Sequence, residues 1–211
     1  TKLAADLAAL NVTDRSTIVV VHDREWVTPA TRVLVTLRYA GLGDRAALLD
    51  GGQGAWVRAG HAVTTEVPAA GRGSVTPKVN AAVIADVETV KAAARPGSGT
   101  RIVDARAPVF YDGPPHGEHR EGHLPTAVNI PFTSIVNEDV TIKSVDELRA
   151  LFTAAGIKPG ESIVVYCHIG QQATLVFTAA RLLGHPVRLY DGSFDDWNRR
   201  NLPREGGRPA S

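Results

Sequence analysis

The sequence predicts an α/β fold in which mainly parallel sheets are flanked by helices. Short runs of β-branched residues alternate with stretches of amphipathic, helical periodicity, a pattern typical of βαβ units. The order strand, loop, helix, strand, Asp-Gly and Trp also occurs twice, so that Asp191 follows Asp50 by 141 residues. A repeat of this length predicts two related α/β domains.

The first repeat is the shorter of the two. Its predicted elements are a strand at 18–21, a loop that opens with His22-Asp23, a helix at about 31–39 and a strand at 46–49. Glycines end the helix, and Trp56 lies six residues after Asp50, as Trp197 does after Asp191. Residues 68–79 are rich in Pro, Gly and small residues and predict a linker.

The second repeat carries more elements than the first. We predict helices at 86–94, from Ser144 to about 156 and at 172–183, and strands at 101–104, 127–130, 163–166 and 187–190. Ser144 and Glu147 form a capping-box pattern, whereas residues 108–122 read as a polar loop rich in Pro and His. Ligands bind at the carboxyl ends of strands in such a sheet, where both Asp104 and Cys167 fall.

Cys167 is the only cysteine, and it lies where a buried strand is expected to give way to a helix. The backbone N–H groups of the loop and the positive end of the helix favour the thiolate, which is the nucleophilic form. Gly170 follows three residues later, in keeping with an active-site loop. The alternative is that Cys167 is a small buried apolar residue, as free cysteines commonly are.

Composition narrows the classes of function. The 211 residues are 44% hydrophobic and 21% charged, which is typical of a soluble globular protein. A net charge of +1 with interspersed signs disfavours nucleic acid and anionic membranes as partners. One cysteine excludes an internal disulfide, and the sequence contains no methionine, so a signal peptide would not be visible. Localisation therefore stays open, with the cytoplasm favoured over an export compartment.

Five motifs of the second repeat resemble a known family. They are Val103-Asp104-Ala105-Arg106, Gly122-His123-Leu124-Pro125, Cys167-His168-Ile169-Gly170-Gln171-Gln172, Asp191-Gly192 and Trp197. Their order and spacing are similar to those of a rhodanese domain, and the duplication resembles the tandem-domain sulfurtransferases of the thiosulfate or 3-mercaptopyruvate type. The resemblance implies a partial, non-catalytic rhodanese-like domain at 1–67 with a truncated N-terminus, a linker at 68–79 and a catalytic domain at 80–211. Asp23 is expected at the position that corresponds to Cys167.

The resemblance and the loop chemistry together assign the site residues. Cys167 is the predicted catalytic nucleophile, and Arg106 is grouped with the loop as a substrate-binding residue, although a buried pair with Asp104 that orders the loops is the favoured interpretation. Asp104, His123 and Trp197 are expected to support the site. The remaining predicted substrate-binding residues are His168, Ile169, Gly170, Gln171 and Gln172, of which the two glutamines are expected to contribute mainly backbone N–H groups.

The expected reaction moves a sulfane sulfur through a persulfide on Cys167. The donor is a small anion, thiosulfate or 3-mercaptopyruvate, and the acceptor is cyanide, a small thiol or a protein thiol. No metal or organic cofactor is required, and a monomer is expected. Two alternatives stay open: a non-catalytic persulfide carrier loaded by a partner protein, and, less favoured, a cysteine phosphatase. Phosphatase chemistry needs an arginine six positions after the nucleophile, where this chain has Ala173.

One segment departs from the pattern of the family. Tandem sulfurtransferases usually carry an Arg-aromatic-Arg arrangement shortly after the Asp-x-Arg strand, and this chain has Phe110-Tyr111-Asp112 there. The contact with the donor anion is then expected to shift to His116, His119 or Arg120. A zinc site at these histidines and His123 is disfavoured, because Pro114-Pro115 and Gly117 predict a loop.

Overall fold

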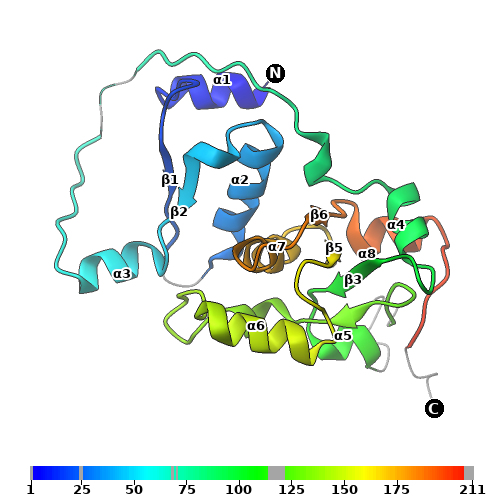
Figure 1. Cartoon of the computed structure of the whole chain (residues 1–211). Coiled ribbons are helices and arrows are strands. Elements are labelled where there is room, and N and C mark those ends of the chain that lie inside the picture. Colours follow the sequence, from blue (N-terminus) through cyan, green and yellow to red (C-terminus); the bar gives the residue numbers. More distant parts are fainter. Residues whose placement is uncertain (1, 24–25, 68, 70, 114–121, 207–211) are drawn as a thin grey trace. The chain divides into compact units, whose positions relative to one another are not determined.

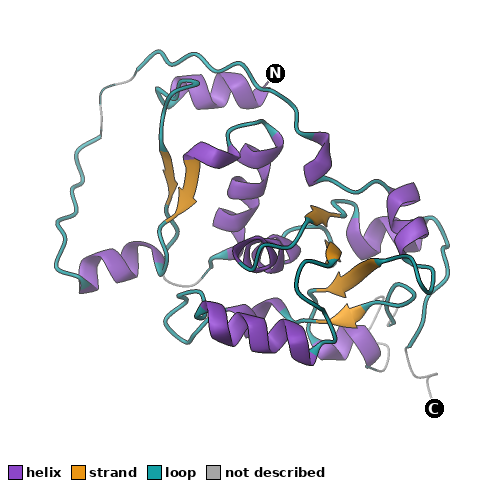
Figure 2. Ribbon diagram, viewed as in Figure 1, coloured by secondary structure: helices purple, strands orange, loops and turns teal. Residues whose placement is uncertain are grey.

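The computed structural model describes residues 2–23, 26–67, 69, 71–113 and 122–206. The chain divides into two compact units, Thr1–Ala81 and Ala82–Ser211 (Figure 1). Each unit is built from parallel strands flanked by helices, as the sequence predicts (Figure 2). Among the described residues, no helix has the length and apolar character needed to cross a membrane.

The second unit contains a four-stranded parallel sheet in the order β4-β3-β5-β6. The two central strands are β3 (Thr100–Asp104) and β5 (Ser162–Tyr166), and the outer ones are β4 (Val128–Asn129) and β6 (Val187–Leu189). The helices are α4 (Val87–Ala93), α5 (Pro108–Asp112), α6 (Val145–Ala154), α7 (Ala173–Leu182) and α8 (Ser193–Arg199).

Helices cover both faces of this sheet. Successive strand residues point to opposite sides, so each central strand is buried on both faces. Ile102, Val164 and Tyr166 form one core cluster with residues of α4 and α8. The intervening residues Val103 and Val165 are equally buried, and α7 packs against β5 and β6. A strand buried on both faces reads as a continuous apolar run, which is why residues 163–166 are so easily recognised in the sequence.

The first unit contains only two strands, β1 (Ile18–Val20) and β2 (Ala46–Leu48), paired in parallel. Its helices are α1 (Lys2–Ala9), α2 (Thr28–Tyr39) and α3 (Gly52–Arg58), and α2 packs against both strands. A small core forms around Leu7, Leu37 and Leu42.

The structure corrects the prediction of a loop from residue 108 onward, because α5 (Pro108–Asp112) is helical. Pro108 starts this helix, where a missing N–H costs nothing, and Gly113 ends it after five residues. A helix this short has too little periodicity to be seen in the sequence. The capping box of Ser144 and Glu147 is confirmed at the start of α6.

Candidate active site

Cys167 directly follows the last residue of β5, and α7 begins six residues later. Its side chain is only 1% exposed. The backbone N–H of Gly170 donates to Sγ at 3.2 Å, and Gly170 adopts a left-handed φ of 83°, which glycine tolerates without strain. The sulfur therefore lies inside the turn of the loop and receives a donor suited to a thiolate.

The start of α8 holds the backbone of this loop. The Cys167 N–H donates to Ser193 Oγ at 3.2 Å, and the Cys167 carbonyl accepts from the Phe194 N–H at 3.0 Å. The His168 carbonyl accepts from the Asp195 N–H at 3.1 Å. The first three residues of α8 are thus joined to the cysteine loop by three hydrogen bonds, a role that the sequence pattern alone does not reveal.

The predicted loop residues lie around the thiol as follows. The ring of His168 packs edge-on against Phe110 of α5 with centroids 4.7 Å apart, and Ile169 is 66% exposed at the rim. Gln172 is the N-cap residue of α7, and its side-chain oxygen is buried without a hydrogen-bond partner. Phe110 is not among the predicted site residues, because the sequence predicts a loop where α5 places it against His168.

Asp104 and Arg106 form a buried ion pair at the end of β3, with 2.6 Å between Nη2 and Oδ2. The guanidinium also donates to the Gly122 carbonyl and lies over the Phe194 ring, 3.8 Å from its centroid. Burial alone would lower the pKa of Arg106, but its hydrogen bonds to Asp104 and the charge of that carboxylate outweigh burial and raise it. This placement favours the ordering role for Arg106 over contact with a donor.

Tyr166 connects this ion pair to the strand that carries Cys167. Its hydroxyl donates to Asp104 Oδ2 at 2.5 Å and accepts from the Leu124 N–H at 3.1 Å. Burial, and then the charge of Asp104, raise the pKa of Tyr166 well above its ordinary value, so the hydroxyl keeps its proton.

His123 and Trp197 both hold the C-terminal segment. The His123 ring stacks on Tyr111 with centroids 3.9 Å apart, and its backbone exchanges two hydrogen bonds with Glu205. Trp197 is buried and donates to the Pro203 carbonyl at 2.7 Å. His116, His119 and Arg120 lie outside the residues that the structure describes. Among the described residues, no group of three metal-ligating side chains occurs.

The structure corrects the match between the two repeats by one residue. In the second unit, the Tyr190 N–H donates to the Val165 carbonyl and the Phe194 N–H to that of Cys167. In the first unit, the Leu49 N–H donates to Val20 and the Gln53 N–H to His22. His22, not Asp23, therefore stands at the position of Cys167. The strands give the same match, because residues 18–21 correspond to 163–166 and are followed by His22 and Cys167.

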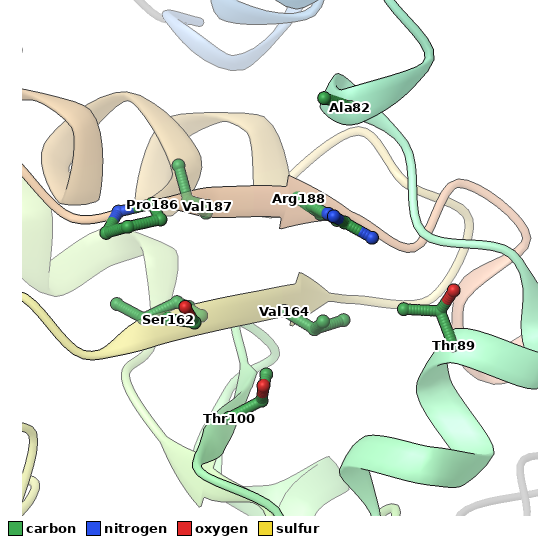
Figure 3. A pocket seen from close by; sticks show the side chains of 9 residues that line it. Ala82, Thr89, Thr100, Ser162, Val164, Pro186, Val187 and Arg188 are labelled. Atoms are coloured by element: carbon green, nitrogen blue, oxygen red, sulfur yellow. The ribbon is translucent and has the colours of Figure 1, made fainter.

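A separate cavity of about 310 Å³ lies at the opposite edge of the second unit's sheet. It is lined by the first residues of three strands, Thr100, Ser162 and Val187, together with Thr89 and Arg188 (Figure 3). Ligands of open α/β sheets bind at the carboxyl ends of the strands, so this cavity is not part of the Cys167 site.

A model of the rhodanese-like domain matches residues 86–200, more than half of the chain. The chain belongs to the rhodanese-like family. The resemblance inferred from the Asp-Ala-Arg, Gly-His-Leu-Pro and cysteine-loop motifs is thereby confirmed. The family match also covers every element from α4 to α8 that builds the site.

Named relatives of this rhodanese-like chain handle sulfur. Sulfur carrier protein TtuD of Thermus thermophilus is 37% identical over 89% of this chain and 70% of its own length. The 3-mercaptopyruvate sulfurtransferase of Escherichia coli is 30% identical over 88% of this chain and 67% of its own. The crystal structure of SseA from Escherichia coli, a 3-mercaptopyruvate sulfotransferase, gives a TM-score of 0.79 at 28% identity, covering 92% of this chain and 72% of SseA.

The structure of EanB gives a TM-score of 0.83 at 23% identity, a likeness of fold that covers 99% of this chain and 54% of EanB. The rhodanese-like chain thus spans about two thirds of the length of its curated relatives and about half that of EanB.

Proposed function

We propose that this chain is a sulfurtransferase that carries sulfane sulfur as a persulfide on Cys167. The observation that carries the proposal is the position of the Cys167 thiol. Its sulfur is buried at the end of β5 and accepts a hydrogen bond from the Gly170 N–H, inside the turn that precedes α7. Family membership and the sulfur chemistry named for the relatives support it.

The proposed loading step is a displacement at sulfur. The Cys167 thiolate attacks the outer sulfur of thiosulfate, a new S–S bond forms, and the old S–S bond breaks with its electron pair leaving on sulfite. With 3-mercaptopyruvate the C–S bond breaks instead, and pyruvate leaves after its carbon takes up the thiol proton. In both cases the product is a persulfide anion, which the loop amide can stabilise as it does the thiolate.

The proposed unloading step needs an acceptor from outside the chain. Cys167 is the only cysteine of the sequence, so no second thiol of this chain can resolve the persulfide. Cyanide, a small thiol or a protein thiol attacks the outer sulfur and releases the Cys167 thiolate. His168 and Ile169 are the proposed donor and acceptor contacts, because they lie at the rim of the site, while Asp104 and Arg106 order the loops behind it.

A persulfide carrier loaded by a partner protein is the second candidate. The name of TtuD, the relative with 37% identity, favours it. A carrier holds sulfur on the same Cys167 but has little turnover with free thiosulfate or 3-mercaptopyruvate, which separates it from the enzyme.

Steady-state kinetics test the proposal and divide the two candidates. Initial rates are measured with thiosulfate or 3-mercaptopyruvate as donor and cyanide or dithiothreitol as acceptor. The enzyme predicts parallel double-reciprocal lines with at least one donor, the pattern of a ping-pong reaction. A carrier predicts one equivalent of sulfur taken from a persulfidated protein and no sustained turnover with either donor. Turnover retained in Cys167→Ser would contradict both.

A further inference from the structure

The turn that follows β6 contains an unusual backbone conformation next to the reactive cysteine. Ser193 is fully buried and has a φ of 54°, in the left-handed region that residues other than glycine rarely adopt. Gly52 occupies the matching position of the first unit with a φ of 58° and makes the same backbone hydrogen bond, from its N–H to the carbonyl three residues earlier. Glycine thus satisfies this turn without strain, and the second unit uses serine instead.

Gly52 and Ser193 also differ in the groups that lie next to them. In the first unit a Cβ at Gly52 would lie 2.3 Å from the His22 carbonyl oxygen and 2.9 Å from the imidazole, so a side chain does not fit. In the second unit the matching residue, Ser193, carries a hydroxyl. It donates to the Tyr190 carbonyl at 2.8 Å, so its lone pairs are left to accept the Cys167 N–H at 3.2 Å.

We propose that Ser193 is a positioning residue for Cys167, and the proposal rests on the function proposed above. The hydroxyl fixes the amide of the cysteine, while Phe194 and Asp195 fix the carbonyls of Cys167 and His168. With both sides of the Cys167 backbone held, the sulfur stays aligned with the Gly170 N–H and with the direction of attack on the donor. Strain retained at a functional position is expected where the side chain serves that function.

Two variants of Ser193 separate positioning from general stability. Ser193→Ala removes the hydroxyl and keeps the strained backbone, whereas Ser193→Gly removes the hydroxyl and relieves the strain. Asn201→Gly is the matched control, since Asn201 is an exposed left-handed residue of the same unit with a φ of 52°. All three are loaded with thiosulfate or 3-mercaptopyruvate in single-turnover experiments that follow the release of sulfite or pyruvate.

Positioning predicts that Ser193→Ala and Ser193→Gly lower the maximal loading rate by a similar factor, about 10- to 100-fold, since small misplacements of a reacting atom are costly. The half-saturating donor concentration should stay within about twofold of wild type, because donor binding is not the property removed. The melting temperature should differ between the two variants, with Ser193→Gly the more stable, while Asn201→Gly loads at the wild-type rate.

Two results would overturn the role of Ser193. One is a loading rate within about twofold of wild type in both variants, and the other is a rate loss that follows the melting temperature instead of the hydroxyl. If wild type takes sulfur from neither donor, the proposed sulfurtransferase function fails. The hydrogen bond between the Cys167 N–H and the Ser193 hydroxyl, the anchor, is then tested by hydrogen exchange. Protection of the Cys167 amide should be lost in both Ser193 variants and kept in Asn201→Gly, and protection retained in all three would refute the anchor.

Discussion

The two units share one strand, loop and helix scaffold and differ in what it holds. The segments β1 to α2 and β5 to α7 make equivalent backbone hydrogen bonds to the strands and turns that follow them. The loops have the same length, because α2 begins six residues after His22 and α7 six residues after Cys167. The two units therefore differ in the side chains placed on this scaffold, a thiol next to a serine hydroxyl in one unit and an imidazole next to a glycine in the other.

The surroundings of the two strands differ as much as the side chains do. Val19 of β1 is 54% exposed, whereas Val164, its counterpart by strand register in β5, is 1% exposed. β5 has β3 as a neighbour on one side and β6 on the other, while β1 pairs with β2 alone in the described residues. Cys167 thus follows a strand that has a neighbouring strand on each edge and is buried on both faces.

The largest expected effect, on the rate of sulfur transfer, comes from substituting Cys167, with a substitution at the matching position of the first unit as the control. Cys167→Ser should lower sulfur transfer by at least about 10³-fold, because it removes the nucleophile. His22→Ala, at the equivalent position of the first unit, should leave turnover within about twofold of wild type. Both are measured as thiocyanate formed from thiosulfate and cyanide. A large loss in His22→Ala would show that the first unit takes part in the chemistry.

The ion pair behind the site should give the next largest effect, on stability. Arg106→Met leaves the Asp104 carboxylate buried without its cation, which should lower the free energy of unfolding by about 3–5 kcal/mol. The exposed pair of Arg149 and Asp146 is the matched control, and Arg149→Met should cost about 0–0.5 kcal/mol. Urea unfolding followed through Trp197, with Trp26 and Trp56 replaced by phenylalanine, measures both. Equal effects of the two substitutions would contradict the buried role of Arg106.

Matched valines test the difference in burial between β5 and β1. Val164→Ala removes two buried methyl groups and should cost about 2 kcal/mol. Val19→Ala, at the same register position, should change stability by less than about 0.5 kcal/mol, because its side chain is half exposed. Thermal unfolding by calorimetry gives both values. A cost at Val19 as large as that at Val164 would mean that the face of β1 is covered in solution.

The smallest expected effect concerns the helix ends at low pH. Hydrogen bonds from the Ser144 hydroxyl and then from its backbone N–H lower the pKa of Glu147 at the start of α6, whereas α2 has no side-chain cap. Because the folded-state pKa of Glu147 is lowered, its ionised carboxylate stabilises the start of α6. This stabilisation is present above the ordinary glutamate pKa and is lost as pH falls through the folded-state pKa.

Amide exchange at the first turn of α6 provides the measurement for this cap. Its protection factors should fall as the pH drops below about 5, while those of α2 lack this dependence. Glu147→Gln should remove the dependence, and a dependence that persists in that variant would assign it to another group.

Much of this fold, and the position of Cys167 within it, can be predicted from the sequence. Buried parallel strands are continuous apolar runs, and a cysteine at the end of such a run, followed by Gly170, falls at the edge where these sheets bind ligands. The Asp104–Arg106 pair follows from two charges at the end of a buried strand, which must compensate each other.

Other features depend on distances that the sequence does not show. The match of Asp23 to Cys167 was wrong by one residue, because strand register and the backbone hydrogen bonds that follow it place His22 there. Phe110 reaches His168 through a helix too short to leave a periodic pattern. Ser193 bonds to an amide 26 residues earlier, and its left-handed conformation is invisible in a motif where serine reads as a turn residue.

The mass of the intact protein after incubation with thiosulfate, and separately with 3-mercaptopyruvate, tests the central claim most directly. The account predicts that wild type gains one sulfur atom from at least one donor, that fragmentation places it on Cys167, and that cyanide removes it. Cys167→Ser should gain none, and His22→Ala should load as wild type does. Sulfur found elsewhere, or no gain from either donor or from a persulfidated protein, would contradict the assignment of Cys167 as the sulfur-carrying residue.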